Sequence, residues 1–414
     1  MNVLHPCCAG LDVHKKNVVA CRITQDAQAK QVVEVQTFST MTPDLLRLCA
    51  WLRAGQVSQV ALESTGVYWQ PVYNILEAHF HLMLVNPRHF KNVPGRKTDV
   101  KDAQWLAELL QVGLLKPSFV PPPAQRELRD LVRYRSTLIG ERATLCNRVQ
   151  KLLEGANIKL ASVATDVLGV SGRAILEALI AGQRDPAVLA ELAKARLRNK
   201  KALLEQALTG RFTDTQGFIL THLLSLIDAL EESIEAFDQK IDAACCPFAE
   251  AVQRLDTIPG VGQAVAQAIV SEIGTDMSRF PTAAHLCAWA GVAPGSNESA
   301  GKRLSSRVRR GNRALRTALL QAAHAAAHQK DTYLSAQYRR LAFRRGPKKA
   351  AMAVAHSILR IAYHLIERQE EYRELGGDYF DKRRPDDTVR RLSQRLGQLG
   401  YQVTPNPQMA PLAA

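Results

Sequence analysis

Four acidic side chains have the type and spacing to hold metal ions. Asp12 and Glu63 each end a short β-branched run, and Asp99 and Asp102 lie three residues apart on one face of a predicted helix. Carboxylate oxygens that converge from two strand ends and one helix can bind a pair of Mg²⁺ ions, which clamp the attacking and leaving oxygens of a phosphodiester. The four acids therefore predict a site of phosphoryl transfer on a polynucleotide; the alternative is four unrelated surface acids.

The elements that would position these acids follow a definite order. The pattern predicts strands at residues 7–13, 17–24 and 31–38, a helix at 43–52 capped by Thr42, a strand at 57–63, a helix after Gly66, a strand at 82–85 and a helix from about Thr98. Three strands in a meander followed by alternating helices and strands are typical of an RNase H-like fold, where a metal site lies between central strands and a late helix. We expect an α/β domain of this class at residues 1–120.

The charge of the chain favours a nucleic-acid partner. The 414 residues include 54 Lys and Arg against 39 Asp and Glu, and the resulting net charge of +15 attracts polyanions. No apolar run approaches the roughly 20 residues that span a bilayer, and no signal peptide is evident, so we expect a cytoplasmic, nucleoid-associated protein with no membrane partner. The eight cysteines lack zinc spacing, and we expect them to be reduced thiols.

A run of prolines at residues 121–123 predicts the end of the first domain, because proline interrupts helices and central strands. Beyond it, leucines repeat every seven residues from Leu131 to Leu152, and a second heptad pattern covers residues 220–241. Both predict a helical coiled coil within residues 124–245. It could be an intramolecular hairpin or the interface of a homo-oligomer, and we favour assembly. Residues 186–208 predict one basic helix, either a solvated face or a phosphate-binding surface.

A glycine-rich turn begins the last third of the chain. The sequence T-I-P-G-V-G at residues 257–262, followed by an apolar helix, resembles a helix-hairpin-helix element. Gly260 and Gly262 would let backbone N–H groups approach a phosphate without a Cβ in the way, and the next helix would add the positive end of its dipole. The alternative is a tight turn between packed helices.

We expect residues 291–302, which are rich in small residues, to form a flexible loop. A stretch without acidic residues begins near the end of this loop. Residues 299–330 contain no Asp or Glu. Their first half holds the cations Lys302, Arg303, Arg307, Arg309, Arg310, Arg313 and Arg316. Cations at this density repel one another and are best tolerated beside a DNA or RNA backbone. Ser299 begins the stretch, where a hydroxyl could attack a phosphate held by arginines, or could simply belong to a turn.

Six motifs together resemble one known family. They are G-L-D-V-H-K, A-L-E-S-T-G-V-Y-W, K-T-D-V-K-D-A, I-P-G-V-G, A-G-V-A-P-G-S-N-E-S-A-G-K and R-R-G-N-R-A-L-R. In order and spacing they are similar to the insertion-sequence one-ten family of transposases, relatives of the pilin-gene invertase. The similarity extends from about residue 8 to about residue 365.

This resemblance implies a RuvC-like domain that binds metal through Asp12, Glu63, Asp99 and Asp102. It also implies a mostly helical C-terminal transposase domain at residues 246–372, whose nucleophile is Ser299. Family members form a phosphoserine link to DNA and use a structured RNA from the element to pair with donor and target DNA. We therefore expect a Mg²⁺-dependent, RNA-guided recombinase of a prokaryotic cell. We expect this recombinase to assemble as a dimer or tetramer. The tail at residues 373–414 matches no motif, and we expect disorder there.

Other readings of the same residues stay open. Ser296 is a rival to Ser299 as the nucleophile. A RuvC-like junction resolvase or nuclease would instead use metal-activated water, with Ser299 structural. A non-enzymatic DNA-binding or repair scaffold would use the hairpin motif and the basic stretch, and would have no use for four converging acids.

Overall fold

The computed structural model describes residues 3–26, 28, 30–63, 66–86, 99–295, 297–299, 301–305, 307–308, 310–383 and 385–404, without the side chains of 99–101, 297–299, 303 and 304. The chain divides into two compact units, Met1–Val120 (unit 1) and Pro121–Ala414 (unit 2). In the described parts, no helix is long and apolar enough to cross a membrane.

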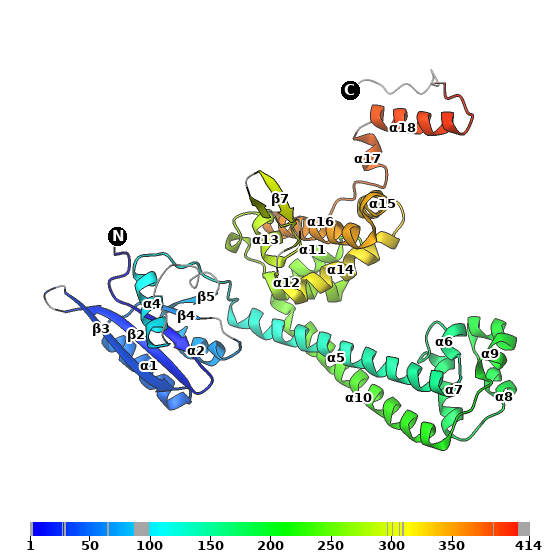
Figure 1. Cartoon of the computed structure of the whole chain (residues 1–414), viewed down its shortest axis with the longest axis horizontal. Helices are drawn as coiled ribbons and strands as arrows, with labels where there is room; N and C mark the ends of the chain where they lie inside the picture. The colour runs from blue at the N-terminus through cyan, green and yellow to red at the C-terminus, as the bar shows by residue number, and fades with distance from the viewer. Residues whose placement is uncertain are drawn as a thin grey trace. The chain divides into compact units, whose positions relative to one another are not determined.

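Unit 1 is built on a five-stranded mixed sheet (Figure 1). Its strands are β1 (Cys8–Val13), β2 (Asn17–Gln25), β3 (Gln31–Ser39), β4 (Gln59–Glu63) and β5 (His81–Val85), arranged in the order β3-β2-β1-β4-β5. β2 is antiparallel to β1 and to β3, whereas β4 is parallel to β1 and to β5. The predicted meander followed by alternating helices and strands is confirmed, and the structure adds that β1, β4 and β5 run parallel, in the strand order of an RNase H-like sheet.

Helices cover both faces of this sheet. Side chains of α1 (Thr42–Ala54) and α2 (Trp69–Leu76) pack on one face against residues such as Leu11 and Leu62. Side chains of α4 (Asp99–Gln111) pack on the other face against Cys8 and Ala61. The predicted helices are therefore present. However, Thr42 is the first residue of α1, and the residue before it, Met41, is the N-cap.

Unit 2 begins with two long helices that pack side by side, α5 (Pro123–Gly155) and α10 (Asp214–Ala244). Arg135 pairs with Asp238 and Arg142 with Glu231, so the two helices run in opposite directions. The heptad pattern thus packs within one chain, as the hairpin alternative required, and this pairing gives no support to the assembly that we favoured.

Short helices join the ends of α5 and α10. They are α6 (Leu160–Val163), α7 (Val170–Ile180), α8 (Pro186–Glu191), the 3₁₀ helix η1 (Ala195–Lys200) and α9 (Lys201–Leu208), packed around a shared apolar core. The single basic helix predicted for residues 186–208 is therefore wrong. α8 ends at Glu191, and Ala195, the first residue of η1, has φ +49°, a left-handed conformation that a continuous α-helix cannot contain.

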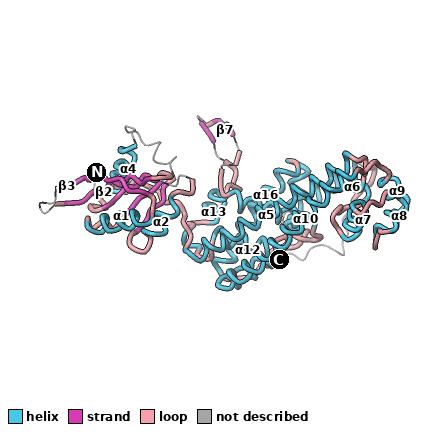
Figure 2. Tube along the Cα trace, turned by 90° about the horizontal axis from the view of Figure 1, so that it is seen from below, coloured by secondary structure: helices cyan, strands magenta, loops and turns pink. Residues whose placement is uncertain are grey.

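The rest of unit 2 is mostly helical, with one short hairpin, as the strand and helix colours in Figure 2 show. Its elements are η2 (Cys246–Phe248), α11 (Ala249–Asp256), α12 (Gln263–Ile273), η3 (Met277–Arg279), α13 (Ala283–Ala290), β6 (Asn297–Ser299), β7 (Lys302–Ser305), α14 (Arg313–His328), α15 (Tyr333–Arg345), α16 (Pro347–Arg368), α17 (Tyr379–Lys382) and α18 (Pro385–Gln398). The core of this region includes a buried face of α16. The expected disorder does not extend over the whole tail, because residues 385–398 form α18. A proline at its first position and the acidic Asp386 and Asp387 in its first turn favour the start of a helix there.

Candidate functional site

Two acids end neighbouring parallel strands in unit 1. Leu11 of β1 pairs with Leu62 of β4, so the next residues, Asp12 and Glu63, lie at the same edge of the sheet. Because side chains alternate along a strand, both acids point to the face that α4 covers. Both are buried, with exposed fractions of 7% and 6%.

A glycine brings the third acid to this edge. An added Cβ on Gly10 would lie 2.2 Å from the carbonyl oxygen of Ala103 and 2.5 Å from the amide nitrogen of Ala107, so α4 contacts the backbone of β1 directly. The Cys8 thiol donates to the carbonyl of Ala107 on the same helix. Asp102, half-buried, therefore lies on a helix held tightly against the strand that carries Asp12.

The electrostatics of Asp12 reflect these neighbours. Burial raises the pKa of the Asp12 carboxyl, and the negative charges of Glu63 and Asp102 raise it further, while His14 opposes the shift. The Nε2 of His14 lies 3.1 Å from the Oδ2 of Asp12. His14 was missed as a site residue in the sequence analysis. The i, i+2 spacing of D-V-H at the end of a strand could have indicated it, because residues two apart share a face.

The donor set suits a divalent cation. Carboxylate oxygens are the ligands that Mg²⁺ takes in proteins, and positive charge stabilises a buried carboxylate whose acidic neighbours raise its pKa. In the part of the chain that the structure describes, no group of three or more His, Cys, Asp or Glu side chains is arranged to hold a metal ion. The side chain of Asp99, the fourth predicted ligand, lies outside the described residues, although its backbone begins α4.

Ser299 lies in a hairpin of unit 2. It ends β6 and pairs with Lys302 of β7, and Gly301 makes the turn with φ +74°. The expectation of a flexible loop over all of residues 291–302 is therefore wrong, because a glycine in the left-handed conformation allows a tight turn. The side chain of Ser299 and the whole of Ser296 lie outside the described residues.

The basic stretch begins on this hairpin and continues into α14. Lys302, Arg307, Arg310 and Arg313 are exposed and Arg316 is half-buried. Among the described residues none of the five side chains has an ion-pair partner. Arg309 and the side chain of Arg303 lie outside the description. The described cations leave their charge available to an anion.

The R-R-G-N-R motif also has a structural role. The Nδ2 of Asn312 donates to the Oε2 of Glu272 at 2.5 Å, while its Oδ1 accepts from the amide of Leu315 and caps α14. Glu272 is 1% exposed and accepts two bonds from the Arg133 guanidinium, at 2.6 and 2.8 Å. This network fixes the start of α14, and with it Arg313 and Arg316, to α5 and α12. Sequence reasoning did not find it.

The two glycines of the predicted hairpin motif have different surroundings. A Cβ on Gly260, which has φ +86°, would lie 2.5 Å from the carbonyl oxygen of Ala322 in α14, so packing accounts for this glycine. Gly262 is exposed, precedes α12 as its N-cap and has open space around it. Of the two, Gly262 is the one whose surroundings leave room for a phosphate.

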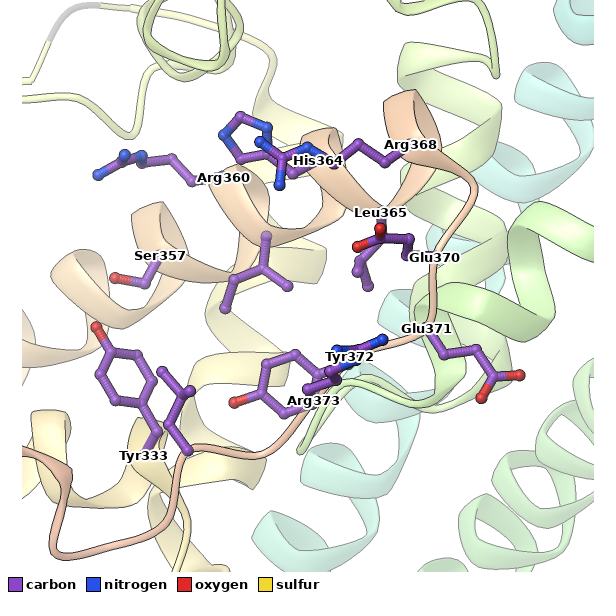
Figure 3. A pocket seen from close by; sticks show the side chains of 12 residues that line it. Tyr333, Ser357, Arg360, His364, Leu365, Arg368, Glu370, Glu371, Tyr372 and Arg373 are labelled. Carbon is purple, nitrogen blue, oxygen red and sulfur yellow. The ribbon is translucent and has the colours of Figure 1, made fainter.

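A further pocket, of about 380 Å³, lies on α16 and was not predicted. Its lining includes Arg360, His364 and Arg368 of α16 and the rings of Tyr333 and Tyr372 (Figure 3). The Tyr372 hydroxyl lies 3.3 Å from the Oε2 of Glu374, and burial raises the pKa of Tyr372. No motif contains these residues.

Comparison with protein families gives two matches. Residues 9–158 match a model for DEDD transposases of the IS110 type, described as "Transposase", and residues 252–339 match one described as "Transposase IS116/IS110/IS902 family". The first match contains all four predicted metal-binding acids, and the second contains Ser299 and the basic stretch. Together the matches cover more than half of the chain.

The individual proteins that this chain is similar to include transposases. The transposase for insertion sequence element IS1111A of Coxiella burnetii is 28% identical over 295 residues, which is 70% of this chain and 72% of that protein. A probable family 20 transposase of Pseudomonas aeruginosa is 28% identical over 321 residues, 76% of this chain and 85% of its own length. Among solved structures, T. thermophilus RuvC in complex with a Holliday junction substrate is 15% identical, with a TM-score of 0.21, and the match covers 27% of this chain and 99% of that one.

Proposed function

Because the chain belongs to the IS110/IS116 family of transposases, we propose that it moves an insertion sequence by cutting and rejoining DNA strands with Ser299 as the nucleophile. The acids of unit 1 would hold Mg²⁺, whose positive charge would make the reacting phosphate more electrophilic. The observation that carries the proposal is the pair Asp12 and Glu63, which are buried side by side at the ends of two parallel strands. The negative charge of Asp102 on α4 is close enough to raise the pKa of Asp12.

Each acid has a distinct part in this proposal. Asp12, Glu63, Asp99 and Asp102 would hold two Mg²⁺ ions, one for the attacking oxygen and one for the leaving oxygen of the phosphodiester. When bound, Mg²⁺ supplies positive charge to a phosphate that would otherwise be repelled by these carboxylates. His14, beside Asp12, would orient that carboxylate through their 3.1 Å contact.

Ser299 would link the protein to DNA for the time between cutting and rejoining. Its hydroxyl oxygen forms a bond to phosphorus while the bond from phosphorus to a sugar oxygen breaks. That sugar oxygen takes a proton, and the serine proton passes to a base. The phosphoserine ester keeps the phosphodiester bond in a form that a second sugar hydroxyl can attack, so strands can be rejoined without another energy source.

The cations of unit 2 would bind the substrate. Lys302, Arg307, Arg310, Arg313 and Arg316 would contact phosphates, and Arg303 and Arg309 belong to the same proposed set. Gly262 at the start of α12 would offer a backbone contact, while Gly260 would shape the turn that carries it. A structured RNA from the element would select donor and target DNA. A homo-oligomer would bring two DNA sites together.

Two variants of one helix test the proposal. Asp102→Asn should abolish recombination between element ends and target on plasmids in Mg²⁺, since it removes a ligand charge without removing a core contact. Glu108→Gln, on the same helix α4 but bonded to Gln104, is the matched control and should retain activity. Recombination by Asp102→Asn at the level of the control would refute the metal role. Cleaved but never rejoined DNA would favour the nuclease instead.

A further inference from the structure

A dense cluster of cations lies at the end of α15, and all of it except Arg339 follows the second family match. Six Lys and Arg residues lie within residues 339–349, namely Arg339, Arg340, Arg344, Arg345, Lys348 and Lys349, with Phe343 among them. From Thr332 to Ile366 the sequence has no Asp or Glu. A concentration of like charge on one surface favours a polyanionic partner.

Phe343 is the unusual member of this group, because its exposed fraction is 94%. It lies in the last turn of α15, with Arg339 and Arg340 one turn earlier on the same face of the helix. After Gly346 the chain enters α16, whose first turn carries Lys348 and Lys349. The ring is therefore exposed to solvent in a segment whose two consecutive helices both carry cations next to it in the chain.

Most of the cations near Phe343 in the chain are free to bind an anion. Arg340 pairs with Asp381 at 3.2 Å and lies over the ring of Phe380, so it is held by α17. Within the described residues, Arg339, Arg344, Arg345, Lys348 and Lys349 form no ion pair. All five are exposed. An exposed aromatic ring with unpaired cations before and after it in the chain combines a stacking surface for a base with contacts for the flanking phosphates.

We propose that Phe343 and the cations around it bind unpaired, single-stranded DNA, with one base stacked on the ring and the neighbouring phosphates held by Arg339, Arg344 and Arg345. Stacking needs a base face that a duplex hides, so the surface selects unpaired strands. The choice of DNA rests on the proposed function, because cutting and exchanging strands leaves DNA bases unpaired. The stacking surface itself rests only on the residues of α15 and α16.

The test measures binding of fluorescent oligothymidylate to the full-length protein by anisotropy, in EDTA so that no strand is cut. Phe343→Ala should weaken this binding about tenfold, which is typical for loss of one stacked base. Binding to a duplex of equal length should not change. Phe343→Tyr should retain the affinity, whereas Phe343→Leu, which is apolar but cannot stack, should lose it.

A matched control separates this surface from exposed aromatics in general. Phe218 of α10 is 67% exposed and its ring contacts His222, and Phe218→Ala should leave the affinity unchanged. Full affinity in Phe343→Leu would mean a general apolar contact, as for a protein partner, and would overturn the proposal. A loss confined to oligouridylate would assign the surface to RNA and overturn the DNA assignment. Oligothymidylate binding in EDTA does not involve the acids of unit 1. If the proposed catalytic role of Asp102 fails, the result for Phe343 therefore still stands.

Discussion

Gly10 of β1 lies so close to Ala103 of α4 that a Cβ on Gly10 would be 2.2 Å from the Ala103 carbonyl oxygen. The contact sets the separation between the strand that carries Asp12 and the helix that carries Asp102. The position of the acids therefore depends on the absence of one methyl group.

Gly10→Ala should displace α4 from β1 and reduce recombination strongly, with a destabilisation of about 1–3 kcal/mol from overpacking. Faster hydrogen exchange in β1 and α4 would report the displacement. Gly140→Ala is the matched control, because nothing lies within 4 Å of a Cβ added there in α5, and alanine should stabilise that helix by about 0.5–1 kcal/mol. Unchanged exchange in Gly10→Ala would show that α4 tolerates the methyl group.

The raised pKa of Asp12 predicts a pH-dependent stability. The folded carboxyl holds its proton to higher pH than the unfolded one, so its contribution to the stability of unit 1 falls as pH rises through that interval. Asp12→Asn carries no such charge. In EDTA at neutral pH it should therefore melt at a higher temperature than the natural protein, and the difference should vanish at acidic pH.

Magnesium should reverse this order. At 100 times its Kd, Mg²⁺ should stabilise the natural protein by about 2.7 kcal/mol and Asp12→Asn much less, as thermal unfolding would show. Glu108→Gln should respond to Mg²⁺ like the natural protein. Equal Mg²⁺ stabilisation of Asp12→Asn and the natural protein would remove Asp12 from the ligand set.

Arg307 and Arg310 should contribute to DNA binding through phosphates alone. Replacing both by Ala should weaken binding to all sequences alike and lower the slope of log K against log salt by about 2. Arg148→Ala with Lys151→Ala, two exposed cations of α5, provides the control and should leave the slope unchanged. A slope that stays the same in the first variant would place Arg307 and Arg310 away from the backbone.

Local patterns were sufficient to predict unit 1. Short β-branched runs indicated its strands, and the adjacency of Asp12 and Glu63 followed from their places at the ends of β1 and β4. The break at Ala195 could not be predicted, because a left-handed alanine has no sequence signal. The contact of Glu272 with Arg133 was equally hidden, since it joins residues 139 positions apart. The heptads predicted α5 and α10 as helices without indicating that they pair within one chain.

The covalent intermediate is the most direct test of the proposed function. Recombination reactions stopped with denaturant should contain a protein–DNA adduct, and peptide mass should place the DNA on Ser299. Ser299→Ala should bind DNA normally and form no adduct, whereas Ser296→Ala should form it. An adduct that survives in Ser299→Ala, or that maps to another residue, would contradict the account.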